Sequence, residues 1–468
     1  MTDEPTPGTP QPGTPQTDVD APAPDQARRR FFRDFAGELL HTAATVAGAA
    51  SVLQRSSIAA ASALLDPEGT AQALAAAETG SGGVALPAGF RTSFRFDSDT
   101  QLLVVDQRRI PEALVEYEVR SAGHAAYAIR HRVVEGGPAC AQVAAIGLAL
   151  SAHGVRESSP AVLRATLKAA ASAVKVSRPP LRSVTWAVDR VMDRFEDLVA
   201  NGADGVAVAI ALRHEADRIV AESTVDNGRI AEMAAAALPG TDDRPLRVLT
   251  HGTSGALSGG QFGTALGALQ ALHHGGRSLH VWVAESRPLL TGSRVTAWEL
   301  AQAGVPHTVV IDAAAGYLIA NGEVDAVIVA ADRIAANGDV VAAIGTYPLA
   351  ALASRHEVPF LVCAALSALD AAAPTGSAVT LETRPERELV APNLRPAPAT
   401  MPLATAVSNP AFDITPTDLI GTLITEEGAL GSPRGAALIA ATEARARRWA
   451  EADATSGGDV FGVAAEVA

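Results

Sequence analysis

From residue 245 onward, short apolar runs alternate with segments long enough to form helices, and this alternation constrains the fold more than any other feature of the chain. Helix-length segments separate most of the five runs, which occupy residues 248–250, 280–283, 308–311, 326–329 and 360–362. Short apolar strands separated by helices are typical of a parallel sheet covered by helices on both faces. Because ligands of such sheets bind beyond the carboxyl ends of the strands, the segments that follow these runs are candidate site residues.

The preceding part of the chain has a mostly helical pattern, which opens with a strand-like run at 102–105. Gly, Pro and Asn residues separate the helices expected at 137–153, 160–176, 180–200 and 203–238. We therefore expect an α/β protein with a mostly helical N-terminal domain at 91–243 and a Rossmann-like parallel-sheet domain at 244–431. A C-terminal helix and tail are expected at 432–468. Thr415 and Pro416 are expected to cap and open a further helix.

The first 90 residues have a different composition. Residues 1–28 are rich in Pro and Thr and are predicted to be a disordered tail, because they cannot bury enough apolar surface to offset the loss of entropy on ordering. Residues 29–90 are interpreted as an added helical segment whose apolar face docks on the protein or on a second subunit. The arginines at 28–30 resemble an export signal, but Asp34 and Glu38 interrupt the apolar stretch that such a signal requires.

Charge and cysteine content exclude several classes of function. The formal net charge of −14 disfavours binding to nucleic acid and to anionic membranes, although a local basic pocket could bind a small anion. Cys140 and Cys363 are the only cysteines, and neither has the spacing of a metal site. Both lie in apolar surroundings, so we expect buried, inert thiols, no metal and no cofactor. A reducing cytoplasmic location fits two unpaired cysteines.

A glycine-rich segment at 250–267 (THGTSGALSGGQFGTALG) follows the first apolar run and leads into a helix pattern. Gly252, Thr253, Ser254 and Gly255 form its turn. Free backbone N–H groups at such a turn favour binding of an anion. The segment matches neither the dinucleotide fingerprint nor the P-loop. Tight packing of a helix on the sheet through small residues is the alternative interpretation.

Six stretches carry a resemblance to a known family over about residues 102–430: 105–108 (VDQR), 177–179 (SRP) with Trp186, the glycine-rich segment, 285–300, 331–339 (ADRIAANGD) and 409–413 (NPAFD). Together they resemble S-methyl-5-thioribose-1-phosphate isomerase of methionine salvage. That enzyme is related to ribose-1,5-bisphosphate isomerase and to the regulatory subunits of translation initiation factor 2B. The resemblance implies an aldose–ketose isomerase scaffold, a sugar phosphate ligand and a homodimer.

The resemblance also assigns residues. It implies that Asp332 is the catalytic carboxyl group and that Arg178 contacts the ligand's phosphate. An aldose 1-phosphate cannot open its ring freely, so the reaction needs an acid of raised pKa and cationic phosphate ligands. The alternatives are that Asp332 caps a helix or pairs with Arg333, and that Arg178 belongs to a surface or interdomain ion pair.

Several positions depart from the family pattern. Gly252 stands at the family's reactive Cys, and Glu135 replaces an Arg that would contact phosphate. Thr291 replaces a Gln, and residues 342–343 are alanines where the family has Asn and Lys. A Glu in place of an Arg beside a dianion would cost several kcal/mol of binding. These departures place the family activity in doubt.

Three hypotheses remain open. The first is an isomerase-type protein that acts on a different, less phosphorylated sugar, with Asp332 as acid or base and with Glu135 as a new base or a ligand for a hydroxyl group. The second is a non-catalytic regulatory protein like the initiation-factor subunits. The third is that the ordinary family reaction persists through other residues. His251 could in principle activate a hydroxyl group, but a structural role is the alternative for it.

Overall fold

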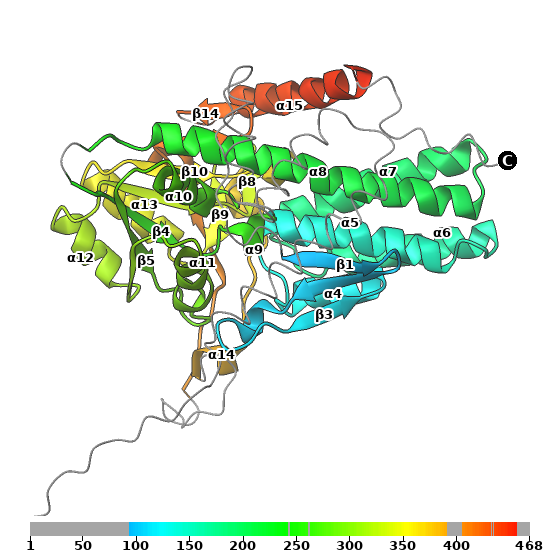
Figure 1. The fold of residues 1–468 in the computed structure, drawn as a ribbon, viewed down its shortest axis with the longest axis horizontal. Coiled ribbons are helices and arrows are strands. Elements are labelled where there is room, and N and C mark those ends of the chain that lie inside the picture. The colour runs from blue at the N-terminus through cyan, green and yellow to red at the C-terminus, as the bar shows by residue number, and fades with distance from the viewer. Residues whose placement is uncertain are drawn as a thin grey trace, which may run out of the picture.

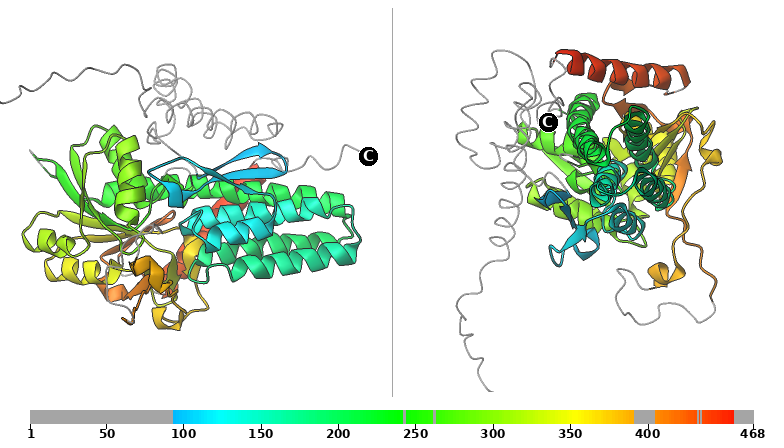
Figure 2. Two further views of the ribbon diagram at one scale, coloured as in Figure 1. Left: turned by 90° about the horizontal axis from the view of Figure 1, so that it is seen from below. Right: turned by 90° about the vertical axis from the view of Figure 1, so that its right-hand side faces the viewer.

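The computed structural model describes residues 93–241, 244–260, 263–390, 405–431, 433 and 435–455. It consists of a mostly helical half and a half built on a large sheet, which lie side by side (Figure 1, Figure 2). The predicted N-terminal tail and added helical segment lie outside the described residues. None of the described helices is long and apolar enough to cross a membrane.

The helical half confirms the four predicted helices: α5 (Gly137–Gly154), α6 (Pro160–Lys175), α7 (Arg182–Ala200) and α8 (Gly205–Ala237). Ser159 and Asp204 cap α6 and α8 with their side chains. The apolar helix α5 lies at the centre and packs against its neighbours through small residues. The predicted strand at 102–105 is β2 (Gln101–Val105). It pairs with two strands that the sequence did not predict, β1 (Phe94–Ser98) and β3 (Glu116–Val119), beside α4 (Ala122–Arg130).

The other half contains a seven-stranded sheet in the order β14-β13-β10-β7-β4-β5-β6. All five predicted apolar runs are strands of this sheet and are parallel to one another: β4 (Leu246–His251), β5 (Leu279–Ala284), β6 (His307–Val310), β7 (Ala326–Ala330) and β10 (Phe360–Cys363). The strand β13 (Thr422–Thr425) is parallel to β10, whereas β14 (Gly428–Leu430) is antiparallel to β13. The helices that separate the strands are α10 (Ala265–His274), α11 (Ala297–Gln302), α12 (Ala314–Ala320) and α13 (Thr346–Arg355).

A second, four-stranded sheet was not predicted. Its strands β8 (Arg333–Ala335), β9 (Val340–Ala343), β11 (Leu369–Asp370) and β12 (Phe412–Thr415) are arranged in the order β11-β8-β9-β12. The prediction of a helix that begins at Thr415 and Pro416 is wrong. Thr415 is the last residue of β12, and a single 3-10 turn, Thr417–Leu419, follows it. The backbone of Thr415 is used by pairing with β9, so its side chain does not act as a helix cap.

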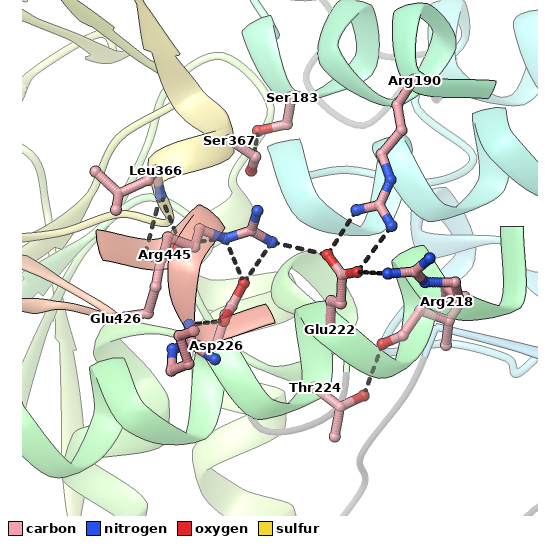
Figure 3. Close-up of polar contacts among 12 residues, drawn as sticks. Ser183, Arg190, Arg218, Glu222, Thr224, Asp226, Leu366, Ser367, Glu426 and Arg445 are labelled. Carbon is pink, nitrogen blue, oxygen red and sulfur yellow. Dashed lines mark hydrogen bonds and ion pairs between the residues drawn. The ribbon is translucent and has the colours of Figure 1, made fainter. Parts of the chain in front are cut away.

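Helix α8 connects the two halves because it packs on α5 and α7 at one end and on α10 and β13 at the other. Helix α15 (Gly435–Thr455) lies along α8 and is joined to it by buried charges (Figure 3). Arg445 of α15 contacts Asp226 at 2.7 Å, Glu222 at 3.2 Å and Glu426 at 2.9 Å. Arg190 of α7 contacts Glu222 at 2.6 Å. We call these five residues the α15 ion network.

Candidate functional site

A cavity lies beyond the carboxyl ends of β4, β5, β7 and β10, where the sheet topology predicted a site. The segment before α5 and the residues that lead into α7 close its other side. The two halves of the molecule therefore both contribute to its wall. Its polar lining residues are Arg132, Glu135, Arg178, Ser183, His251, Thr253, Ser254, Ser258, Thr264, Ser286, Arg287, Thr291, Asp332, Thr346 and Arg384.

Asp332 lies in this cavity, two residues beyond the end of β7. Its backbone N–H donates to the Val341 carbonyl oxygen at 3.0 Å, which fixes the turn between β7 and β8. Burial raises the pKa of the Asp332 carboxyl to about 6; Arg178 opposes this shift, and the negative charge of Glu135 adds to it. A carboxyl group with this pKa can both give and take a proton near neutral pH.

The structure does not support the two alternative roles for Asp332. Arg333 contacts Asp370 at 3.0 Å and also donates to the carbonyl oxygens of Pro179 and Pro180. The element that follows Asp332 is strand β8, not a helix. The side chain of Asp332 instead faces the start of α5, since a Cβ atom at Gly137 would lie 4.0 Å from Asp332 Oδ1.

Arg178 is buried against two carboxylates. Its Nε donates to Glu382 at 3.1 Å, and its terminal nitrogen lies 3.5 Å from Glu135. Arg132 makes the matching contacts, at 3.0 Å to Glu135 and 3.5 Å to Glu382. Arg384 contacts Glu382 at 2.7 Å. We call these five residues the pocket ion cluster, and all of them except Glu382 line the cavity.

The cluster sets the charge state of its carboxylates. Burial acts to raise the pKa of Glu135, but Arg132 and Arg178 outweigh it, so the pKa lies below its usual range. Burial also acts to raise the pKa of Glu382, but Arg178, Arg132 and Arg384 together lower this pKa to about 2. Both carboxylates are therefore ionised near neutral pH. A carboxylate with a low pKa is a weak proton acceptor, which argues against the idea that Glu135 is a new base.

The glycine-rich segment divides into lining residues and packing residues. Gly252, Thr253 and Ser254 line the cavity as predicted. Gly252 has a φ of +75°, and a Cβ atom there would lie 3.4 Å from the Ala343 side chain. Gly252 therefore offers no reactive group, and its left-handed backbone conformation favours glycine.

Gly255 is a packing residue and does not line the cavity. A Cβ atom at Gly255 would lie 2.3 Å from Glu299 Oε2, so only glycine leaves room for the Glu299 carboxyl group. Glu299 also accepts a hydrogen bond from the Leu257 N–H at 2.9 Å. The following helix α9 (Ala256–Gly259) is one turn long, so it supplies little of the helix dipole on which the predicted anion site depends. For this part of the segment, the packing interpretation holds.

The contacts of His251 favour a structural role for its side chain. Its Nε2 lies 2.8 Å from the Ile344 carbonyl oxygen, which makes that nitrogen the donor, and its Nδ1 lies 3.4 Å from Ser286 Oγ. Burial lowers the pKa of the ring. The thiols of Cys140 and Cys363 are buried as predicted, and burial raises the pKa of Cys140 to about 12. Cys363 is among the residues that line the cavity, but its side chain is fully buried, and burial raises the pKa of its thiol well above the usual range.

The sequence did not single out Arg132, Glu382 or Arg384, although all three belong to the pocket ion cluster. Arg132 has a φ of +57°, which is rare for a residue with a side chain. Its position three residues before Glu135 was a signal that could have suggested an ion pair. Glu382 and Arg384 lie about 250 residues further along the chain, and no local pattern predicts their contact with Arg132.

The comparisons with known proteins agree with this architecture. Residues 133–432 match the model of the initiation factor 2 subunit family. The methylthioribose-1-phosphate isomerase of Pelotomaculum thermopropionicum is 38% identical over 341 residues, which cover 73% of this chain and 91% of that protein. The isomerase of the same name from Desulforudis audaxviator is 41% identical over 343 residues, with 73% and 94% of the two chains covered.

Two solved structures extend the comparison. The 5-methylthioribose 1-phosphate isomerase from Pyrococcus horikoshii superposes with a TM-score of 0.66 at 30% identity and covers 76% of this chain and 96% of its own. The delta subunit of translation initiation factor eIF-2B from A. fulgidus has a TM-score of 0.61 at 33% identity, with 73% and 96% covered. The chain therefore belongs to the initiation factor 2 subunit family, among the relatives named methylthioribose-1-phosphate isomerase.

Proposed function

We propose that this protein binds a sugar or sugar phosphate in the cavity and acts as an aldose–ketose isomerase, with Asp332 as the group that transfers the proton. The observation that carries the proposal is the position of Asp332: it lies at the carboxyl edge of the sheet, in a cavity lined by hydroxyl groups, with a pKa raised to about 6. The names of the relatives from Pelotomaculum thermopropionicum and Desulforudis audaxviator, both methylthioribose-1-phosphate isomerases, support the reaction class.

A single carboxyl group can carry out one part of the isomerase reaction but not all of it. Isomerisation moves hydrogen between C1 and C2, and a carboxyl group near its pKa can remove the proton from one carbon and return it to the other. Opening the ring of an aldose 1-phosphate requires, in addition, protonation of the ring oxygen. Gly252 leaves no second reactive group at the position where the resemblance places a Cys. Turnover of methylthioribose 1-phosphate itself is therefore the least supported form of the proposal.

Proton NMR of the purified protein with candidate sugars tests the proposal. Pentoses, pentose 1-phosphates and methylthioribose 1-phosphate would be incubated in D2O, and both the ketose and exchange of deuterium at C2 would be measured. We expect at least one substrate to be converted, and we expect Asp332→Asn to lower its rate by two orders of magnitude or more, as is typical for loss of a general acid or base. Equal rates for the two proteins, or no conversion of any sugar, would contradict the proposal.

A second function, a non-catalytic regulatory protein, has support from a specific observation. Gly252 and the paired guanidinium groups of Arg132 and Arg178 leave the cavity with less reactivity and less free positive charge than the isomerase pattern implies. The eIF-2B delta subunit of A. fulgidus shares the fold at 33% identity. Absence of a thermal shift with every sugar, together with co-purification of a stable protein partner, would favour this function.

The homodimer implied by the resemblance stays a prediction. Apolar side chains are exposed on β6, α12 and α13 and in the segment between β6 and α12, among them Ile311, Tyr317 and Tyr347. An exposed apolar surface of this kind often marks an interface between protein chains. Light scattering at micromolar concentration should give the mass of two chains, and the mass of one chain would contradict the prediction.

A further inference from the structure

We infer that the cavity takes an uncharged polyol, such as a free aldose, because the protein's own carboxylates already occupy the positions from which its arginines would hold a phosphate. This inference rests on the proposed sugar-binding function and narrows its ligand class. It is argued from the geometry of the pocket ion cluster and from the hydroxyl groups that share the cavity with it.

The carboxylates of Glu135 and Glu382 lie beside the same two arginines. Glu135 accepts hydrogen bonds from Arg132 at 3.0 and 3.1 Å and lies 3.5 Å from Arg178. Glu382 lies 3.1 Å from Arg178 and 3.5 Å from Arg132. Each carboxylate thus bridges the same two guanidinium groups, which is the arrangement that a bound phosphate would otherwise make. The bridging carboxylates act as internal substitutes for an anion.

Carboxylates face most of the arginines that line the cavity. The guanidinium groups of Arg132, Arg178 and Arg384 face the carboxylates of Glu135, Glu382 and Glu388. The remaining lining arginine, Arg287, donates to the Leu389 carbonyl oxygen at 2.8 Å. Among the described residues, Arg287 is therefore the one lining arginine whose side chain has a carbonyl oxygen and not a carboxylate as its partner. A dianion held by Arg132 and Arg178 must displace two buried carboxylates or lie beside them. Either event is unfavourable, because a displaced carboxylate loses its partner and a retained one repels the anion.

Several residues that line the cavity have a buried polar atom without a hydrogen-bond partner within the described part of the chain. Ser254 and Ser258 line the cavity and are each 2% exposed. Within the described part of the chain, neither hydroxyl oxygen has a hydrogen-bond partner, and the same is true of Arg132 Nε. A buried polar group without a partner costs free energy that a matching ligand group recovers. Two neutral hydroxyl groups and one N–H group match the hydroxyl groups of a sugar.

The chemistry of a free aldose agrees with this lining. Its anomeric oxygen carries a hydrogen atom, so the ring opens by transfer of that proton to the ring oxygen without loss of a substituent. Interconversion with the ketose then needs removal of a proton from C2 and its return to C1, together with transfer of the hydroxyl proton from O2 to O1, and no oxidant or reductant is consumed. A second reactive group at position 252 is less necessary for such a ligand than for a 1-phosphate.

Isothermal titration with inorganic phosphate tests the inference directly. The wild-type protein would be compared with Glu135→Gln and Glu382→Gln, each of which removes one bridging charge but keeps the size of the side chain. Glu386→Gln, on the exposed face of α14 (Glu386–Val390), is the matched control for the change in net charge. Circular dichroism would establish that each variant is folded, and the two bridging positions provide independent variants if one fails to fold.

We expect no saturable binding of phosphate to the wild type or to Glu386→Gln at millimolar concentration, and we expect binding at least tenfold tighter in each bridging variant. Saturable binding by the wild type, or unchanged binding in both folded bridging variants, would overturn the inference. A parallel titration with a pentose separates this outcome from failure of the proposed function. Gain of phosphate binding without any pentose binding would support the exclusion of phosphate by the carboxylates, but it would overturn both the assignment of a free aldose as ligand and the proposed sugar-binding function.

Discussion

Two buried clusters of arginine and carboxylate groups lie within this molecule, and they differ in what surrounds them. In the α15 ion network, Glu426, Asp226 and Glu222 are at most 4% exposed, and the contacts of Arg445 and Arg190 with them are 2.6–3.2 Å long. In the pocket ion cluster, Glu135 and Glu382 are 13% and 15% exposed, and their contacts with Arg132 and Arg178 are 3.0–3.5 Å long. The pocket ion cluster forms part of the wall of the cavity described above, and none of the α15 ion network residues lines that cavity.

The difference indicates two uses for the same kind of ion pair. The α15 ion network joins elements that are far apart in the sequence, and Glu426 also accepts the Leu366 N–H at 3.0 Å, just beyond the cavity wall formed by the end of β10 (Figure 3). The carboxylates of this network are almost fully buried, so its ion pairs are shielded from solvent. The pocket ion cluster faces open space, so an anion or a hydroxyl group can compete with its carboxylates. The first should govern stability and the second should govern ligand choice.

Removal of Arg445 should give the largest effect. Arg445→Met leaves Asp226, Glu222 and Glu426 buried without their shared cation, and loss of one member of a buried ion pair costs about 3–5 kcal/mol. Urea denaturation should show this loss in the free energy of unfolding. Arg447→Met, on the exposed side of the same helix with 64% exposure, is the matched control and should change it by less than about 0.5 kcal/mol. Similar losses in the two variants would contradict the claim that the α15 ion network governs stability.

Asp332→Asn should stabilise the protein in a manner that depends on pH. The folded carboxyl group has a pKa of about 6, against about 3.9 in an unfolded chain, so its ionisation favours the unfolded state. Its contribution to stability is present below pH 4 and is lost as the pH rises through 6. The variant should therefore exceed the wild type by up to about 3 kcal/mol at pH 8 and match it at pH 4.

Measurement of the melting temperature across this pH range checks the prediction. The same substitution at exposed Asp418 is the control for loss of one charge. A variant that is less stable than the wild type at pH 8, or a difference that does not change with pH, would show that Asp332 is held as a carboxylate by its neighbours.

Glu135→Gln should cost about 2 kcal/mol, less than loss of Arg445, because Glu382 and water in the cavity still solvate the two arginines. Phosphate should then restore stability to this variant, since a ligand at one hundred times its dissociation constant adds about 2.7 kcal/mol. It should not restore Arg445→Met, in which the lost cation leaves buried carboxylates that repel an anion. Recovery of both variants, or of neither, would contradict the proposed difference between the clusters.

Gly252→Ala should have the smallest effect. The φ of +75° is unfavourable for a residue with a Cβ atom and costs about 1–2 kcal/mol, whereas the 3.4 Å contact with Ala343 is ordinary for a side chain. Thermal denaturation should show this modest loss with no change in fold. Gly252→Cys places a thiol in the cavity at a similar cost. A loss above about 4 kcal/mol would show that the position cannot hold a side chain at all.

Much of the fold followed from periodicity, because long helices and buried parallel strands leave regular apolar patterns. The second sheet did not: β8 and β11 have three and two residues, too few for a period to appear. Asp332 was assigned from the family resemblance, and its place after an apolar run put it at the carboxyl edge of the sheet, whereas the segment around Gly252 was singled out by its glycines after a predicted strand. The contact of Arg132 with Glu382 could not be predicted, since it joins segments 250 residues apart and depends on how the two halves of the molecule meet.

The most direct test of the account is a pair of thermal-shift titrations with a pentose and with its 1-phosphate, performed on the wild type and on Glu135→Gln. The account predicts that the pentose raises the melting temperature of the wild type and that the 1-phosphate does not, whereas the 1-phosphate becomes the better ligand of the variant. Stabilisation of the wild type by the 1-phosphate and not by the pentose would contradict it, because it would show that the bridging carboxylates of Glu135 and Glu382 yield to a phosphate.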